Sequence, residues 1–116
     1  MDCADPERVG SFWQQAVGGS LDRRNPGEYK LLYSDGAPWL YFMAVPEEKS
    51  TKNRVHLDLV TDGSLDDEVG RLVDAGASVI EKRHDPDSYD NPDVWTVMVD
   101  PEGNEFCVTS TATITV

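Results

Sequence analysis

Two segments of the chain carry the same helix-forming pattern, and this internal repeat is the feature that most limits the possible folds. Residues 5–19 and 62–76 each begin with helix-starting residues, carry an apolar stripe at helical spacing and end at glycine. A displacement of 57 positions (76 minus 19) places Gly19 on Gly76 and aligns the two stripes. The repeat indicates that one supersecondary unit occurs twice in the chain.

Each predicted helix has identifiable start signals and one apolar face. Asp5 is a favourable N-cap and Pro6 suits the first helical position, whereas Ser64 is the expected cap of the second helix. The first stripe consists of Val9, Phe12, Trp13, Ala16 and Val17. The second stripe consists of Leu65, Val69, Leu72 and Val73. Both helices are therefore expected to pack one face on a sheet.

Short segments rich in β-branched and aromatic residues surround these helices and are predicted to form strands. They are residues 28–34, 39–45, 54–60, 78–83, 94–99 and 105–115. "DGAP" and "DPEGN" are the turn signals of two hairpins, and in the second the Asp100 side chain is expected to bind turn amides. The acidic, turn-rich segment 83–93 is predicted to be a mobile loop or a lid, with His84 exposed.

The pattern predicts an α+β fold made of two βαβββ modules in a single domain, residues 1–116. Module 1 covers about residues 1–46, a linker covers 47–53, and module 2 covers about 54–116. Because only four residues precede the first helix, the first strand of module 1 is expected to be very short or missing.

Composition narrows the classes of partner. The chain has 116 residues and a net charge of −12, which disfavours nucleic acid and favours either a solvated acidic surface or a cationic ligand. We expect no membrane partner, because no run of 18 apolar residues occurs. The first residues lack the apolar core of a signal peptide, so a cytoplasmic location is expected, with Cys3 and Cys107 reduced.

The segment "NRVHLDLV", residues 53–60, places a histidine in a predicted strand. Val55, Leu57 and Leu59 alternate with His56 and Asp58, so the two polar side chains share one face. His56 is either a ligand-contacting or proton-shuttling imidazole, or a structural histidine that bonds Asp58 or a neighbouring strand. Asp58 either orients His56 or is solvated.

The motifs "DCADPERxxxFW", "VPEEKxxKNRVHLDL" and "VMxDPEGNEFC" extend over nearly the whole chain, and together they resemble the vicinal oxygen chelate superfamily. This superfamily includes glyoxalase I, bleomycin-resistance proteins and extradiol dioxygenases, and the chain looks similar to its small glyoxalase-like members. The resemblance implies curved mixed sheets around a cavity and pairing of two chains as a homodimer.

The resemblance also implies a divalent metal held by two ligands from each half. His56 matches the ligand that opens the second half, but its first-half counterpart would fall at position −1, ahead of the printed sequence. Seven residues after Asp100, where metal-binding relatives carry a carboxylate, stands Cys107, and the first-half match is Met43. We therefore expect no standard metal site, although His56, Glu105 and Cys107 could form a non-standard one.

The remaining candidates have both functional and structural interpretations. Glu105 is either a carboxylate that works with His56 in acid–base chemistry or an exposed strand residue. Cys107 is either a ligand contact or a packing residue, and Met43 is an apolar wall of the cavity. Trp39, Tyr41 and Trp95 are aromatic candidates for contact with a planar ligand.

Two classes of function follow. The first is a small-molecule binder without the standard metal or another cofactor, which takes a cationic or aromatic organic molecule. The second is a metal-dependent lyase, isomerase or dioxygenase of the glyoxalase type that uses His56 with Glu105 or Cys107.

Overall fold

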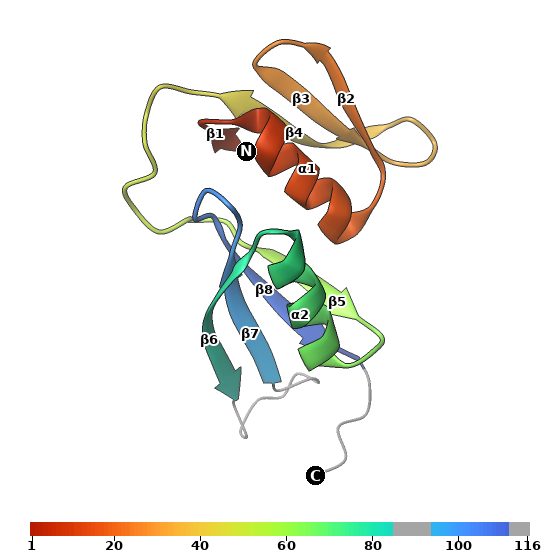
Figure 1. Cartoon of the computed structure of the whole chain (residues 1–116), viewed down its shortest axis with the longest axis vertical. Helices are drawn as coiled ribbons and strands as arrows, with labels where there is room; N and C mark the ends of the chain where they lie inside the picture. The colour runs from red at the N-terminus through yellow and green to blue at the C-terminus, as the bar shows by residue number, and fades with distance from the viewer. Residues whose placement is uncertain (85–93, 112–116) are drawn as a thin grey trace. The chain divides into compact units, whose positions relative to one another are not determined.

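The computed structural model describes residues 1–84 and 94–111, and these form two compact units. One unit is Met1–Thr51 with Pro101–Gly103, and the other is drawn from Lys52–Asp100 and Asn104–Val116. Each unit has a four-stranded mixed sheet and one helix (Figure 1). The predicted α+β fold with two βαβββ modules is thereby confirmed.

The sheet of the first unit has the strand order β1-β4-β3-β2, with β1 parallel to β4 and the other pairs antiparallel. Its helix α1, Pro6–Val17, packs on β2, β3 and β4. The strands are β1 (Asp2–Cys3), β2 (Ser20–Asn25), β3 (Glu28–Leu32) and β4 (Pro38–Ala44). The first strand is as short as predicted.

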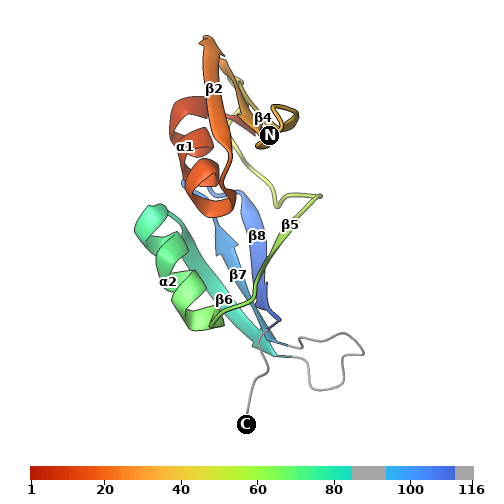
Figure 2. The same cartoon turned by 90° about the vertical axis from the view of Figure 1, so that its right-hand side faces the viewer.

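The second unit repeats this topology in the order β5-β8-β7-β6, with β5 parallel to β8. Its helix α2, Leu65–Ala75, packs on β6 and β8 and lies on one side of the sheet (Figure 2). The strands are β5 (Leu57–Thr61), β6 (Ser78–His84), β7 (Val94–Val99) and β8 (Glu105–Ser110).

The helix caps and most of the apolar stripes are confirmed. The Asp5 side chain accepts a hydrogen bond from the Arg8 amide at 3.1 Å, and the Ser64 hydroxyl accepts one from the Asp67 amide at 3.2 Å. Val9, Phe12 and Trp13 of α1 are buried, as are Leu65 and Leu72 of α2. Val73 was expected in the second stripe but is 43% exposed.

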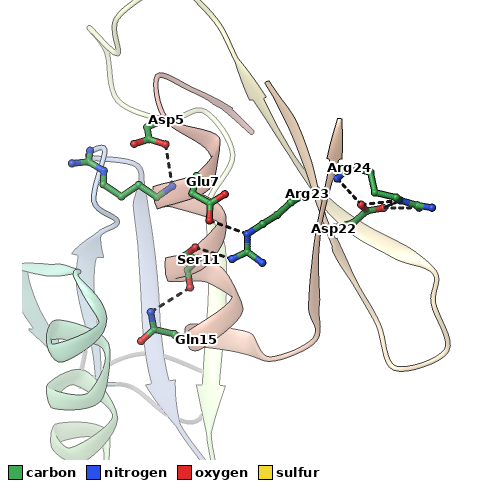
Figure 3. A network of polar contacts seen from close by, with 8 residues as sticks. Asp5, Glu7, Ser11, Gln15, Asp22, Arg23 and Arg24 are labelled. Atoms are coloured by element: carbon green, nitrogen blue, oxygen red, sulfur yellow. Dashed lines mark hydrogen bonds and ion pairs between the residues drawn. The ribbon is translucent and has the colours of Figure 1, made fainter. Parts of the chain in front are cut away.

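Strand β2 was missed because its sequence, SLDRRN, lacks apolar alternation. Its backbone pairs with β3, and Arg23 binds Glu7 of α1 at 2.8 Å, while Arg24 binds Asp22 of the same strand at 2.7 Å (Figure 3). The side-chain hydrogen bond from Arg24 lowers the pKa of Asp22 to about 2. An edge strand that faces solvent can be polar on both sides, so sequence periodicity gives no signal for it.

Other strand boundaries differ from the prediction by a few residues. The predicted strand 54–60 begins later, because β5 starts only at Leu57. Of the predicted strand 105–115, β8 covers Glu105–Ser110, the exposed Thr111 follows it outside the strand, and residues 112–115 lie outside the described residues. Of the predicted loop 83–93, the first two residues belong to β6 instead, and residues 85–93 lie outside the described residues. His84 is exposed as expected.

Backbone hydrogen bonds show that the first strands of the two units are displaced by 58 positions (61 minus 3), not 57. The Val45 amide donates to the Cys3 carbonyl at 2.9 Å, and the Thr111 amide donates to the Thr61 carbonyl at the same length. The same displacement relates the two helix C-caps, so Gly18 and not Gly19 corresponds to Gly76. An apolar helical stripe alone cannot fix such an alignment to one residue, because neighbouring positions share a broad face.

The turn between β7 and β8 contributes to both units. The buried Asp100 carboxylate accepts bonds from the Asn104 amide and side chain at 3.0–3.1 Å, which confirms the predicted turn chemistry. The Glu102 carboxylate, which belongs to the first unit, accepts bonds from the amides of Ala4 and Asp5 at 2.6 and 2.7 Å. These amides lie at the start of α1, where a negative charge is favourable.

The connection from α1 to β2 offers a test of the first unit. Gly18 and Gly19 both have positive φ, 82° and 90°, but only a Cβ at Gly19 would collide with the Leu32 carbonyl oxygen. We expect Gly18→Ala to cost about 1–3 kcal/mol of unfolding free energy from backbone strain. Gly19→Ala should cost clearly more, because β3 must also shift.

Urea unfolding of the two variants measures this difference. Equal losses of unfolding free energy would contradict the close approach between Gly19 and β3.

Candidate functional site

Each sheet has one face that its own helix leaves uncovered, and we call this the helix-free face. Along β8, Phe106, Val108 and Ser110 are buried, whereas the alternating Glu105, Cys107 and Thr109 are only half-buried. Side chains at every second position point to the same side of a sheet. The half-buried set therefore lies on the helix-free face.

Strand pairing places several candidate site residues of the second unit together on this face. Asp58 of β5 pairs with Cys107, which pairs with Val97 of β7. Thr109 pairs with Trp95, which pairs with Arg83 of β6. The second helix-free face comprises Asp58, Val60, Glu81, Arg83, Trp95, Val97, Val99, Glu105, Cys107 and Thr109.

His56 differs from the prediction. It directly precedes β5 instead of lying within a buried strand, and its side chain is exposed. Its Nε2 atom lies 3.1 Å from the carbonyl oxygen of Asn53. His56 therefore contacts a backbone group three residues away in the chain. The sequence had suggested Asp58 or a neighbouring strand as its partner.

Glu105 contacts the same short loop. Its Oε2 accepts a hydrogen bond from the Asn53 amide at 2.9 Å, in a partly buried setting. Sequence reasoning did not single out Asn53, because its contribution is made by backbone groups that any residue would supply.

Cys107 stands among charged neighbours. Burial raises the pKa of its thiol, and the negative charge of Asp58 raises it further, while Arg83 and Lys52 act in the opposite direction. The thiol is therefore less reactive than an unperturbed cysteine, because only the thiolate is a good nucleophile or metal ligand.

The first helix-free face is aromatic. Lys30 pairs with Tyr41 and Asp22 across the sheet, and Glu28 pairs with Met43. Trp39 lies where the β3–β4 register shifts, is half-buried and stacks on Tyr33, with ring centroids 5.6 Å apart and planes inclined by 19°. The face comprises Asp22, Glu28, Lys30, Tyr41 and Met43, with the stacked Tyr33–Trp39 pair at the Pro38 end of β4.

Strand pairing also changes one correspondence between the units, because β4 and β8 are displaced by 66 positions (107 minus 41). Phe42 and Val108 are fully buried at equivalent points of β4 and β8, so Tyr41 and not Met43 corresponds to Cys107. A first-half metal ligand at this position would have to be a phenol, which is a poor substitute for a carboxylate.

Comparison with known proteins agrees with this architecture. Residues 1–109 match the family model of the glyoxalase-like domain. The chain belongs to the glyoxalase-like family. This places it in the vicinal oxygen chelate superfamily, as the sequence motifs indicated. No curated protein matches the chain.

Solved structures show the same fold. A glyoxalase/bleomycin resistance protein/dioxygenase family enzyme from Burkholderia phytofirmans is 21% identical, with a TM-score of 0.74 and coverage of 95% of this chain and 93% of that one. The fosfomycin resistance protein FosX from Listeria monocytogenes, in a complex with Mn(II) and dihydroxypropylphosphonic acid, is 14% identical, with a TM-score of 0.72 and coverage of 98% and 86%. Lactoylglutathione lyase from Agrobacterium tumefaciens is also 14% identical, with a TM-score of 0.62 and coverage of 96% and 89%.

The metal that this glyoxalase-like fold implies does not fit the donors described. Oε2 of Glu105 already accepts an amide proton, and burial and Asp58 raise the pKa of the Cys107 thiol, which disfavours the thiolate that a metal needs. Within residues 1–84 and 94–111, no three His, Cys, Asp or Glu side chains gather closely enough to hold a metal ion. Neither α1 nor α2, the helices of these residues, has the length and apolar character needed to cross a membrane.

The environment of Cys107 in this glyoxalase-like protein can be tested by alkylation. In Asp58→Asn, the thiol pKa should fall, so the thiolate fraction at pH 8 and the rate of iodoacetamide modification should rise several-fold. Peptide mass spectrometry separates Cys107 from the buried Cys3.

The matched control is Asp74→Asn, which removes an exposed carboxylate of α2 that is not among the groups that act on Cys107. An unchanged rate in Asp58→Asn, or an equal increase in the control, would contradict the assigned coupling.

Proposed function

We propose that this glyoxalase-like protein binds a small, planar, cationic organic molecule on its first helix-free face, without the standard metal site. The observation that carries the proposal is the stacked Tyr33–Trp39 pair. Tyr33 is 53% exposed and Tyr41 is 42% exposed, so aromatic ring area remains available. Such rings bind planar ligands through their faces and attract cations.

Charge on this face and on the whole chain supports a cationic ligand. Lys30 already lies 5.5 Å from the Tyr41 ring centroid, which shows that this ring can accept a positive charge. Glu28 lies on the same face, and the net charge of −12 raises the local concentration of cations. Names of structural neighbours, such as bleomycin resistance protein and FosX, support the small-molecule part of the proposal.

The proposal extends to a cytoplasmic homodimer. The two free cysteines, Cys3 and Cys107, support a reducing compartment, and exposed Tyr41, Met43 and Val60 supply apolar area for a partner chain. Asp58, Trp95 and Cys107 remain proposed contacts of the second helix-free face.

Ligand binding can be measured on the indole N–H signals of the three tryptophans by NMR. We expect phenyltrimethylammonium to shift the Trp39 signal and to bind at least tenfold more weakly to Trp39→Leu, because the stacking surface is removed. Benzenesulfonate, which has the same ring and the opposite charge, should bind more weakly to the wild-type protein.

The matched control is Val73→Ala, which trims an exposed apolar side chain on α2 and should leave binding unchanged. Undiminished binding by Trp39→Leu, or a preference for benzenesulfonate, would overturn the proposal.

The metal-free part of the proposal has its own test. We expect elemental analysis to find substoichiometric metal, and Mn²⁺, Ni²⁺ and Zn²⁺ to leave the Tm unchanged relative to a chelator. A stoichiometric metal whose stabilisation disappears in His56→Ala would instead support the metal-dependent lyase, isomerase or dioxygenase that uses His56 with Glu105 or Cys107.

A further inference from the structure

Lys30 lies at the centre of the first helix-free face. It is half-buried on β3, and strand pairing places Asp22 of β2 on one side of it and Tyr41 of β4 on the other. Its Nζ atom lies 5.5 Å from the centroid of the Tyr41 ring. An ammonium at this distance is attracted by the face of the ring. Lys30 therefore occupies the place on Tyr41 that the cation of a ligand would take.

Asp22, the acidic neighbour of Lys30, is already engaged by Arg24. The Nε atom of Arg24 lies 3.0 Å from Oδ1 of Asp22, Nη2 lies 2.7 Å from Oδ2, and the Arg24 amide adds a bond to Oδ1 at 3.0 Å. Figure 3 shows this pair on one side of β2, whereas Arg23 is directed towards α1. Within residues 1–84 and 94–111, Lys30 forms no ion pair or hydrogen bond, so the Tyr41 ring is its close partner.

A half-buried ammonium beside a ring is a receptor for an anionic group. The ammonium of lysine is a compact charge with three donors, and its hydrogen bonds to carboxylates are stronger than those to neutral acceptors. A ligand with only a positive charge would meet the repulsion of Lys30 when it approached Tyr41. A carboxylate on the same ligand removes this conflict, because Lys30 can then turn from the ring to the carboxylate.

The spacing of the aromatic residues suits a ligand of one ring with a charge at each end. Trp39 and Tyr41 are two residues apart on β4, which corresponds to about 7 Å along a strand. A ring that contacts the Tyr33–Trp39 pair can therefore bring a substituent close to Tyr41 and Lys30. All of these residues belong to the first unit.

We propose that Lys30 is a specificity-determining residue that binds the carboxylate of a zwitterionic ligand, while the cationic part of that ligand replaces Lys30 on the Tyr41 ring. The ligand class is a planar organic cation that also carries a carboxylate. This inference rests on the proposed function, because it names the class of molecule bound on the same face.

Three ligands with the same cationic ring isolate the effect of the carboxylate. They are phenyltrimethylammonium, 4-(trimethylammonio)benzoate and the methyl ester of the latter, each titrated against the Trp39 indole signal by NMR. We expect the carboxylate compound to bind about fivefold more tightly than either of the others, which is the upper range for one partly exposed ion pair. The ester has nearly the same shape but no negative charge, so it should gain no such preference.

Substitution of Lys30 should reverse this order. In Lys30→Met the preference for the carboxylate compound should disappear, and phenyltrimethylammonium should bind more tightly than to the wild type, because the Tyr41 ring is uncovered. Lys30→Arg keeps the positive charge and should keep the preference. The matched control is Arg23→Met, which removes a positive charge from the other side of the same sheet, where Arg23 binds Glu7 of α1, and should also keep it.

The contact between Lys30 and Tyr41 has a test without any ligand. The methylene protons beside the Lys30 ammonium should be shifted upfield by the ring, and Tyr41→Leu should return them to the position typical of a solvated lysine. An unshifted signal in the wild type would overturn the proposed role of Lys30, whatever the titrations give.

The titrations separate this inference from the proposed function. Equal binding of phenyltrimethylammonium and the carboxylate compound by the wild type, or a preference that survives in folded Lys30→Met, would overturn the role of Lys30 alone. If Lys30→Met does not fold, the wild-type preference and its retention in Lys30→Arg decide. If none of the three ligands shifts the Trp39 signal, the proposed function itself is overturned.

Discussion

The alternation of side chains across a sheet that is covered by one helix determines most of what this protein can present to a ligand. In each unit the helix covers one face, and the core collects there: Phe42 and Leu31 in the first unit, Phe106 and Met98 in the second. The side chains at the alternate positions of each strand must then lie on the opposite face of the sheet. Aromatic rings and titratable groups gather on the helix-free faces for this reason.

This constraint explains why the fold and the face membership of the candidates were predictable. Period-two spacing grouped Asp58 with His56, and Glu105 with Cys107, and strand pairing places Asp58, Glu105 and Cys107 on one face. The caps at Asp5 and Ser64 and the turn at Asp100 were also predictable, because a single side chain bonds a nearby amide.

The sequence could not predict features that depend on backbone partners or on register. Strand β2 is held by its pairing with β3 and by the contact of Arg23 with Glu7, neither of which gives a periodic apolar pattern. The repeat displacement was one residue short, because strand hydrogen bonds and not the helix stripe determine it. His56 was identified as a candidate, but its partner is a carbonyl group, which every residue carries and no motif reveals.

The short turn Pro101–Gly103 has a consequence for how the protein can be divided. Although β7 and β8 flank it in sequence, this turn belongs to the first unit, where Glu102 binds the amides that precede α1. Cutting the gene at the linker would therefore not yield two self-sufficient halves. In an isolated N-terminal fragment these two exposed amides would bond to water instead, and α1 would lose the carboxylate at the positive end of its dipole.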